Sequence, residues 1–351
     1  MKKILTLVLA LMLVVSCFAA VAEEPLYISV ISKGEQHAFW QAVRKGCEDA
    51  AAEYGVEMYY YGPPSESDIV LQVEALNAEM QKEPAAIALA SLSTESVMAQ
   101  LSECVEKGIP VIGFDSGVPN APEGAIYATA STNNKNAAAL AAEEMLKLEG
   151  FADALAAGTA DAPVVIGVLS QDATSESVTG RTTGFVDKMY ELASQYNTVA
   201  VTGHDLWTKE AEGAGVIIKV EIAATPEVTD VTNAANALLN TDGMYAIFCS
   251  NEGAVTGFLA ATSSGADLAE GGIYGDLIVA GFDAGSPQKN AVRQGWFVGS
   301  VTQDPYQIGY QAVKLAYEAA TGVEVADVDT GAQWYTAANI DEPDIALLVY
   351  D

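Results

Sequence analysis

IVAGFDAG at residues 278–285 and VIGFDSG at residues 111–117 each join an apolar, strand-like run to a Gly-Phe-Asp sequence. Two further stretches also end an apolar run in polar residues, VISKGEQHAFW at 30–40 and IFCSNEG at 247–253. In an open α/β sheet a ligand binds outside the carboxyl ends of the strands, so four such ends predict one composite pocket. These stretches therefore indicate a protein that binds a small molecule.

The chain around these stretches alternates strand-like runs with amphipathic helical patterns. Apolar residues recur at helical spacing after each of the first three strands, and two of these helices end at Gly55 and Gly108. The strands expected in the first part span residues 26–31, 56–61, 86–90 and 109–114. Strands that alternate with helices of this length predict an α/β fold with a parallel sheet covered on both faces.

The pattern then restarts, which predicts a second domain. We expect a first hinge crossing at 125–131 and a helix over 133–148. Residues 150–163 are rich in Ala, Gly and Asp, which is typical of a surface excursion. The second series of strands is expected at 164–169, 198–201, 216–222, 246–249 and 277–282, with helices at 185–192 and 228–240.

The N-terminus, residues 1–22, has the features of a secretory signal peptide. Two lysines precede an apolar stretch over 4–15, and Ala20-Val21-Ala22 supplies small residues for cleavage. The apolar stretch is too short for a stable membrane-spanning helix, so we expect an exported protein. VVSC at 14–17 also resembles a lipobox, which would lipidate Cys17. The short distance from Cys17 to the first strand favours simple cleavage, because tethered domains usually have a longer polar linker.

Composition excludes several classes of partner. The 351-residue chain has a formal net charge of -31, so nucleic acid and anionic membrane surfaces are excluded as partners, since both are bound through excess Lys and Arg. Beyond Cys17 the cysteines are Cys47, Cys104 and Cys249, which lie in apolar patterns and are expected to be buried thiols. With only two histidines in the chain, a histidine metal site is not expected.

Six motifs in order resemble one family: SKGEQHAFW, GIPVIGFDSG, TGRTTGF, FCSNEGAVTG, VAGFDAG and VTQDPYQIG. From residue 26 nearly to the C-terminus the chain is similar to the type 1 periplasmic binding proteins of the ribose-binding group, the receptors of ABC sugar importers. The resemblance implies two doubly wound parallel-sheet (Rossmann-like) lobes, joined by a three-strand hinge, with the ligand in the cleft between them. The N-terminal lobe would comprise residues 23–131 and 304–332, and the C-terminal lobe 132–303 and 333–351.

The resemblance also implies which side chains bind the sugar. Phe39 and Trp40 match the family's stacking aromatics, although Phe39 also fits the apolar stripe of the following helix. Asp115 and Asp283 would each accept hydrogen bonds from adjacent hydroxyls, one from each lobe. The competing interpretation is that these aspartates cap a helix or form a turn.

The remaining candidates are Arg181, Asn251, Gln303, Ser91 and His37. Arg181 would donate to two ligand oxygens, or else form a surface salt bridge. Asn251 and Gln303 offer both a donor and an acceptor, Ser91 matches a weaker position and could instead cap a helix, and His37 could donate to a hydroxyl.

The sequence also departs from the family pattern. Ser116, the tenth candidate for a ligand contact, stands where ribose-type receptors commonly have an arginine. No aromatic residue occurs near Pro226, where the family uses one. The extra stretch 204–215 contains Trp207, which either replaces that aromatic residue or decorates the surface. These departures limit the predicted ligand to a monosaccharide or related polyol.

Three classes of function remain. The first is an extracytoplasmic solute-binding protein that closes around the ligand and delivers it to an ABC permease; we expect it to act as a monomer without a cofactor. The second is a sugar-sensing receptor for a chemoreceptor or histidine kinase. The third is a glycosidase, but that reaction needs a carboxylic acid with a raised pKa in an apolar setting, whereas Asp115 and Asp283 follow glycine-containing turns near an arginine. The sequence favours the first class and predicts that the protein is not an enzyme.

Overall fold

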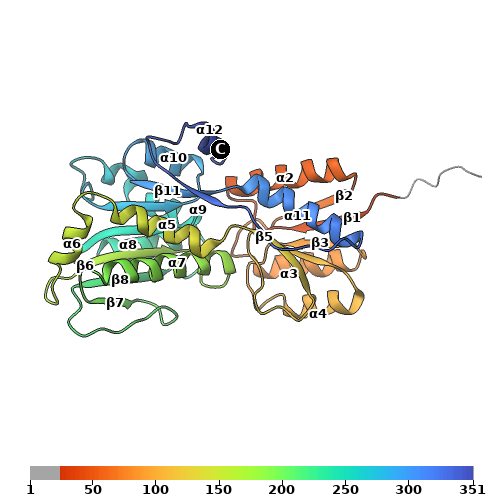
Figure 1. Ribbon diagram of the computed structural model, residues 1–351, viewed down its shortest axis with the longest axis horizontal. Helices are drawn as coiled ribbons and strands as arrows, with labels where there is room; N and C mark the ends of the chain where they lie inside the picture. Colours follow the sequence, from red (N-terminus) through yellow and green to blue (C-terminus); the bar gives the residue numbers. More distant parts are fainter. Residues whose placement is uncertain (1–23, 351) are drawn as a thin grey trace, which may run out of the picture.

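The computed structural model describes residues 24–350, which form two α/β lobes side by side (Figure 1). The first lobe is built on a six-stranded sheet in the order β12-β5-β4-β3-β1-β2, in which every pair is parallel. Its strands are β1 (Tyr27–Ile31), β2 (Glu57–Tyr61), β3 (Ala86–Leu89), β4 (Val111–Phe114), β5 (Ile126–Ser131) and β12 (Val328–Asp329).

Helices cover both faces of this sheet. One face packs against α2 (Ala38–Tyr54) and α11 (Pro305–Ala320), and the other against α3 (Ile69–Met80) and α4 (Met98–Lys107). Helices α2 and α11 come from opposite ends of the chain and lie beside each other (Figure 1). Their close approach requires glycine, because a Cβ at Gly46 would lie 2.0 Å from the Tyr306 carbonyl oxygen and one at Gly309 would lie 1.9 Å from that of Val43.

The second lobe is built on a seven-stranded sheet in the order β13-β11-β10-β9-β6-β8-β7. Only the pairing of β13 with β11 is antiparallel. Its strands are β6 (Val164–Ser170), β7 (Val199–Thr202), β8 (Val216–Ile222), β9 (Met244–Cys249), β10 (Ile278–Phe282), β11 (Gly299–Gln303) and β13 (Ala332–Tyr335).

Helices also cover both faces of the second sheet. One face packs against α5 (Asn134–Leu146), α6 (Phe151–Ala157) and α7 (Glu176–Ala193). The opposite face packs against α8 (Val228–Leu239), α9 (Glu252–Ala261), α10 (Ser286–Arg293), the short α12 (Pro343–Ala346) and the 3-10 helix Ser263–Leu268.

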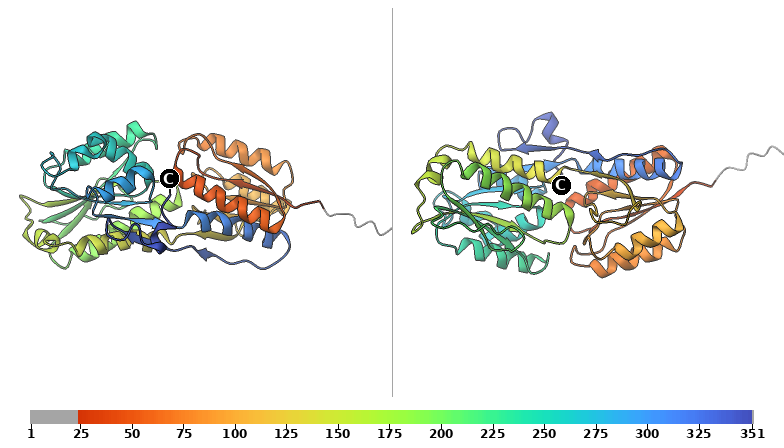
Figure 2. Two further views of the ribbon diagram at one scale, coloured as in Figure 1. Left: turned by 90° about the horizontal axis from the view of Figure 1, so that it is seen from above. Right: turned by 60° about the horizontal axis from the view of Figure 1, so that its bottom comes forward.

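The chain passes between the lobes at three places, after β5, after β11 and between β12 and β13. Figure 2 shows the two lobes as separate bodies of sheet and helices in both further views. The predicted fold class, two doubly wound α/β lobes, is confirmed. The carboxyl ends of β1, β4, β9 and β10 bring the four stretches that the sequence singled out to the space between the lobes.

One predicted segment is wrong. Residues 150–163 were expected to form a surface excursion, but they contain α6, whose Phe151 and Leu155 are fully buried. These two residues are four apart and therefore lie on one face of the helix, where they join the core of the second lobe. The helix expected at 185–192 is also longer, because α7 begins at Glu176.

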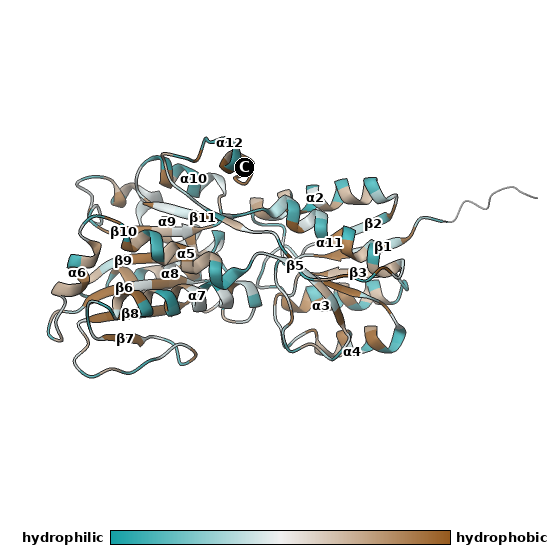
Figure 3. Cartoon of the chain, viewed as in Figure 1, coloured by the Kyte–Doolittle hydropathy of each residue, from teal (hydrophilic) through white to brown (hydrophobic). Residues whose placement is uncertain are grey.

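The hydropathy pattern follows the layers, with apolar residues along the strands and polar residues on the outer helix faces (Figure 3). Cys47, Cys104 and Cys249 are buried free thiols, which confirms the expectation from sequence. Burial raises the pKa of the Cys104 thiol to about 11. Within residues 24–350 no helix combines the length and the apolar character needed to cross a bilayer. The predicted signal peptide and Cys17 lie outside the described residues.

Candidate functional site

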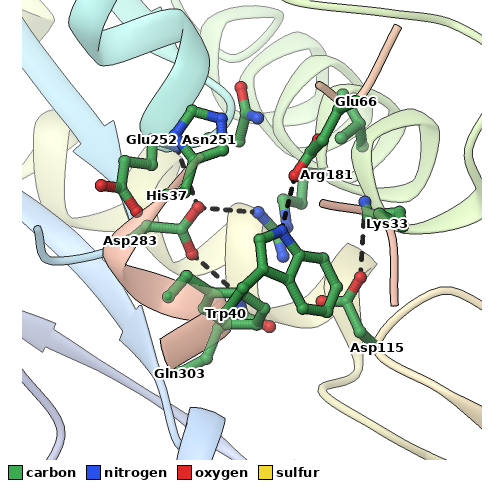
Figure 4. Close-up of a pocket in the computed structure, with 12 residues that line it drawn as sticks. Lys33, His37, Trp40, Glu66, Asp115, Arg181, Asn251, Glu252, Asp283 and Gln303 are labelled. Carbon is green, nitrogen blue, oxygen red and sulfur yellow. Dashed lines mark hydrogen bonds and ion pairs between the residues drawn. The ribbon is translucent and has the colours of Figure 1, made fainter. Parts of the chain in front are cut away.

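A small cavity lies between the lobes and is lined by side chains from both (Figure 4). The first lobe contributes residues that follow β1, β2 and β4, and the second lobe contributes residues of α7 and residues at the ends of β9, β10 and β11. The lining consists of Lys33, His37, Phe39, Trp40, Glu66, Asp115, Val178, Arg181, Asn251, Glu252, Asp283 and Gln303.

Lys33 and Asp115 form a buried ion pair on the first-lobe wall. Lys33 Nζ lies 3.3 Å from Asp115 Oδ2 and also donates to Ser177 Oγ in the second lobe at 3.1 Å. Burial opposes the charged form of Lys33, but the attraction of the nearby carboxylates, Asp115 first, raises the pKa of Lys33. Asp115 has a left-handed backbone with φ 55°, a conformation that a residue other than glycine rarely adopts.

Trp40 and Glu66 form the adjoining part of this wall. Trp40 Nε1 donates to Glu66 Oε1 at 2.8 Å, and Glu66 Oε2 accepts from Gln171 Nε2 of the second lobe at 2.6 Å. Burial opposes ionisation of Glu66, but Lys33, His37 and these two hydrogen bonds hold the pKa of Glu66 below its usual range. Trp40 packs edge-on against Phe39, so both aromatic residues belong to the first-lobe core as well as to the cavity lining.

Arg181 and Asp283 form a second buried ion pair, on the second-lobe wall. Arg181 Nη1 donates to Asp283 Oδ2 at 3.2 Å, and Arg181 Nε donates to Asn134 Oδ1 at 2.9 Å. The guanidinium carbon lies 4.0 Å from the centroid of the Phe282 ring. Gln303 Nε2 donates to Asp283 Oδ1 at 2.8 Å. The ion pair is therefore internal rather than the surface salt bridge that the sequence left open.

Asn251, Glu252 and Asp283 meet at the start of α9. Asn251 Oδ1 accepts from the Ala254 N–H at 3.0 Å, and Asp283 Oδ2 accepts from the Glu252 N–H at 2.9 Å. Asp283 has φ 79°, again in the left-handed region. Asp283 thus accepts a hydrogen bond at the N-terminus of α9 and also lines the cavity. Its interpretation as a capping residue and its interpretation as a ligand contact are therefore compatible.

Eight of the ten side chains predicted from sequence line this cavity, and Ser91 and Ser116 do not. Ser91 Oγ donates to the Ser93 carbonyl at 2.8 Å, and Ser116 Oγ accepts from the Ser177 N–H of the other lobe at 3.3 Å. Trp207 is also absent from the lining. It is buried against the second-lobe core, and its Nε1 donates to Thr183 Oγ1 at 2.9 Å, so it does not supply the replacement aromatic residue. Most other residues of 204–215 lie at the surface.

Sequence reasoning missed four lining residues: Lys33, Glu66, Val178 and Glu252. Lys33 and Glu252 lie inside the strand-end stretches from which the pocket was predicted, and their position alone was a usable signal. Glu66 follows β2, whose end has no comparable motif.

Several acceptor atoms of the site are unpaired. Gln303 Oε1 and Glu252 Oε2 are buried and have no hydrogen-bond partner among the described residues. Asp115 Oδ2 likewise makes no hydrogen bond in the described part of the chain, apart from its ion pair with Lys33. Buried acceptors are normally satisfied, so a ligand with several hydroxyl donors is complementary to this cavity.

The lobes also touch at the edge of the cavity. Ser65 Oγ and Ser67 Oγ of the first lobe both donate to Glu227 Oε1 of the second, at 2.6 and 2.8 Å, and we call this group the rim contact. The Thr94 N–H donates to the Thr174 carbonyl at 3.3 Å. These contacts close the cavity from the outside.

The family described as "Periplasmic binding protein domain" matches residues 28–324 of this chain. The chain belongs to the periplasmic binding proteins. It is 26% identical over 323 residues to the D-allose-binding periplasmic protein of Escherichia coli (strain K12), a match that covers 91% of each protein. The resemblance predicted from six motifs is therefore confirmed.

Two solved structures of similar proteins extend this comparison. One is described as an ABC transporter, LacI family transcriptional regulator from Brachyspira murdochii, with 42% identity, a TM-score of 0.77 and coverage of 93% of this chain and 99% of that chain. The other is an ABC transporter solute binding protein from Agrobacterium vitis with bound D-fucose, with 26% identity, a TM-score of 0.74 and coverage of 92% and 100%.

This periplasmic binding protein is accordingly extracytoplasmic, and its family implies an ABC transporter permease as partner. The family and these relatives are transport proteins rather than enzymes, in agreement with the prediction from sequence.

Proposed function

We propose that this periplasmic binding protein captures a monosaccharide or related polyol in the cavity between its lobes and delivers it to an ABC permease. One observation carries the proposal. Asp115 and Asp283, which end corresponding strands of the two lobes, line one cavity together with two aromatic residues and with buried acceptors that lack partners. The eight lining residues predicted from sequence are the proposed ligand contacts.

Binding and closure are coupled because neither lobe holds a complete site. A ligand bound to His37, Trp40 and Asp115 alone would gain the contacts of Arg181, Asp283 and Gln303 only on closure. This difference in affinity shifts the equilibrium toward the closed form, which the permease recognises. We further propose the lobe boundaries 23–131 plus 304–332 and 132–303 plus 333–351, a monomer, and export by the signal peptide with cleavage after Ala22.

The proposal is tested by thermal-shift screening of residues 23–351 against neutral pentoses and hexoses, inositols, amino acids and nucleosides, followed by calorimetry. The panel includes D-allose and D-fucose. A ligand bound only by the folded protein raises its melting temperature. We expect a shift with one or a few neutral monosaccharides or polyols. Shifts with amino acids or nucleosides alone, or no shift at all, would overturn the proposed ligand class.

A further inference from the structure

Glu252 occupies a position between the lobes that the proposed ligand contacts do not explain. It is the first residue of α9, in the second lobe, and is 9% exposed. The N–H groups of Ala38 and Phe39, at the start of α2 in the first lobe, lie near its carboxyl group and act to lower its pKa. The side chain therefore extends from one lobe to a helix N-terminus of the other.

The two oxygens of this carboxyl group have different surroundings. Oε1 is packed against the loop after β10, because a Cβ at Gly285 would lie 2.5 Å from it. Oε2 is buried and has no hydrogen-bond partner among residues 24–350, and the side chain lines the cavity beside Asp283 and His37 (Figure 4). A buried oxygen without a partner, on a side chain that lines a cavity, is suited to a ligand donor.

We propose that Glu252 is a ligand-binding residue, whose ionised carboxyl group accepts a hydrogen bond from a hydroxyl of the bound monosaccharide through Oε2. The inference rests on the proposed function and adds a contact to it. Acceptance by the ionised form is favoured over donation by the protonated form, because the N-terminus of α2 places N–H groups and the positive end of a helix dipole beside the carboxyl group. A hydroxyl hydrogen bond to a carboxylate is also stronger than one to a neutral acceptor.

The groups that face Glu252 come from several elements. His37 lies at the start of α2, Asp283 at the end of β10, and Tyr335 and Tyr350 in the C-terminal segment. Burial raises the pKa of Glu252 to about 7, with Asp283 acting in the same direction and His37 and the α2 N–H groups acting against it. Near neutral pH the closed site without ligand therefore holds a mixture of protonated and ionised Glu252.

The sign of the pH effect follows from this. A ligand that binds the ionised form lowers the pKa of Glu252, so binding near pH 7 releases part of a proton. Affinity is highest above the pKa of the free site and falls as the pH drops below it, by up to about tenfold per pH unit. A ligand that instead accepted a hydrogen bond from the protonated form would take up a proton, and its affinity would fall with rising pH.

The test is isothermal titration calorimetry at pH 7 in two buffers of different ionisation enthalpy, with the neutral monosaccharide found by the screen, D-allose and D-fucose being the first probes. We expect release of about half a proton by the unchanged protein and none by the isosteric Glu252→Gln variant. Affinity of that variant at pH 8 should be about 3- to 10-fold weaker, and nearly constant from pH 6 to 8. Glu191→Gln on the outer face of α7 is the matched surface control and should keep both the proton release and the affinity.

The outcomes separate the two proposals. Monosaccharide binding without proton release, or with proton uptake, would overturn the role of Glu252 and leave the proposed function intact. Proton release that persists unchanged in Glu252→Gln would also overturn it. Failure of every monosaccharide to bind would overturn the proposed function and this inference with it. Because proton release is measured on the unchanged protein, the result does not depend on how well the Glu252→Gln variant folds.

Discussion

Replacement of Arg181 by alanine should destabilise the ligand-free protein by about 3 to 4 kcal/mol, because it leaves a buried carboxylate without its cation. The Arg181 and Asp283 side chains are 3% and 6% exposed, so water screens their interaction little. Asp283 would keep two neutral donors, the Glu252 N–H and Gln303 Nε2, which places the loss at the lower end of the usual 3–5 kcal/mol range for a broken buried pair. For a lobe of this size the melting temperature should fall by about 6 to 16 °C.

The assay is urea denaturation and calorimetry of the ligand-free protein at pH 7. Lys188→Ala is the control, because Lys188 lies on the same helix and pairs at 2.9 Å with Glu191, which is exposed, and we expect no measurable change. Adding Asp283→Asn to Arg181→Ala removes the stranded charge, so the double variant should be less destabilised than the two single losses added together.

Two results would refute this reasoning. One is a loss below about 1 kcal/mol for Arg181→Ala, and the other is strict additivity with Asp283→Asn. Either would mean that water reaches the pair in the ligand-free protein, and that its burial belongs to the ligand-bound closed form alone. The expected loss also means that Arg181→Ala changes stability and affinity together, so it cannot by itself identify a ligand contact.

Three further predictions concern the rim, the helix packing and the thiols. Glu227→Gln should weaken the rim contact with Ser65 and Ser67 and reduce ligand affinity about two- to fivefold, with a more open ligand-free form in small-angle scattering. The Ser65 and Ser67 hydroxyls lower the pKa of Glu227, so the carboxylate that accepts their hydrogen bonds is fully present above the ordinary carboxyl pKa. The rim contact is lost as the pH falls through the lowered pKa of Glu227, and scattering should therefore show opening only in acid, below about pH 4. Gly46→Ala should cost at least about 1–3 kcal/mol in urea denaturation, whereas Gly117→Ala, whose nearest added contact is 3.7 Å, should cost little; equal losses would contradict the close packing of α2 and α11. The three described cysteines should not react with a thiol reagent at pH 8 until the protein unfolds, and rapid labelling of the native protein would contradict their burial.

The fold could be predicted because its signals are local. Each buried strand is a short apolar run, and each ends in polar residues that a parallel sheet brings to one edge. This signal marked Asp115, Asn251 and Asp283, and all three line the cavity. Gln303 also lines it, but it was predicted from the family resemblance alone. Helix α6 was missed because the Gly and Asp residues in and around it are typical of loops, although its alanines favour a helix, and only two large apolar residues mark its buried face.

The rest of the site depends on contacts between distant parts of the chain. Glu66 belongs to a Ser- and Pro-rich loop, and its place in the cavity is set by Trp40 on one side and by Gln171, more than one hundred residues later, on the other. The partner of Lys33 is fixed only when β1 and β4 lie in the same sheet. No spacing in the sequence indicates that Glu66 contacts Trp40 and Gln171, or that Lys33 pairs with Asp115.

The contacts between the lobes explain why the closed form should depend on ligand. Those at the edge, the rim contact and Thr94 with Thr174, are polar, so closing them exchanges hydrogen bonds with water for hydrogen bonds within the protein. Such an exchange contributes only about 0.5–1.5 kcal/mol for each bond, and less where the pair is exposed. Inside the cavity, closure buries Glu66 and Glu252 and leaves Glu252 Oε2 and Gln303 Oε1 without partners, which opposes closure. A polyol that donates hydroxyls to these acceptors removes that cost only in the closed form. The differential affinity that drives closure therefore comes from the same unpaired oxygens that define the ligand class.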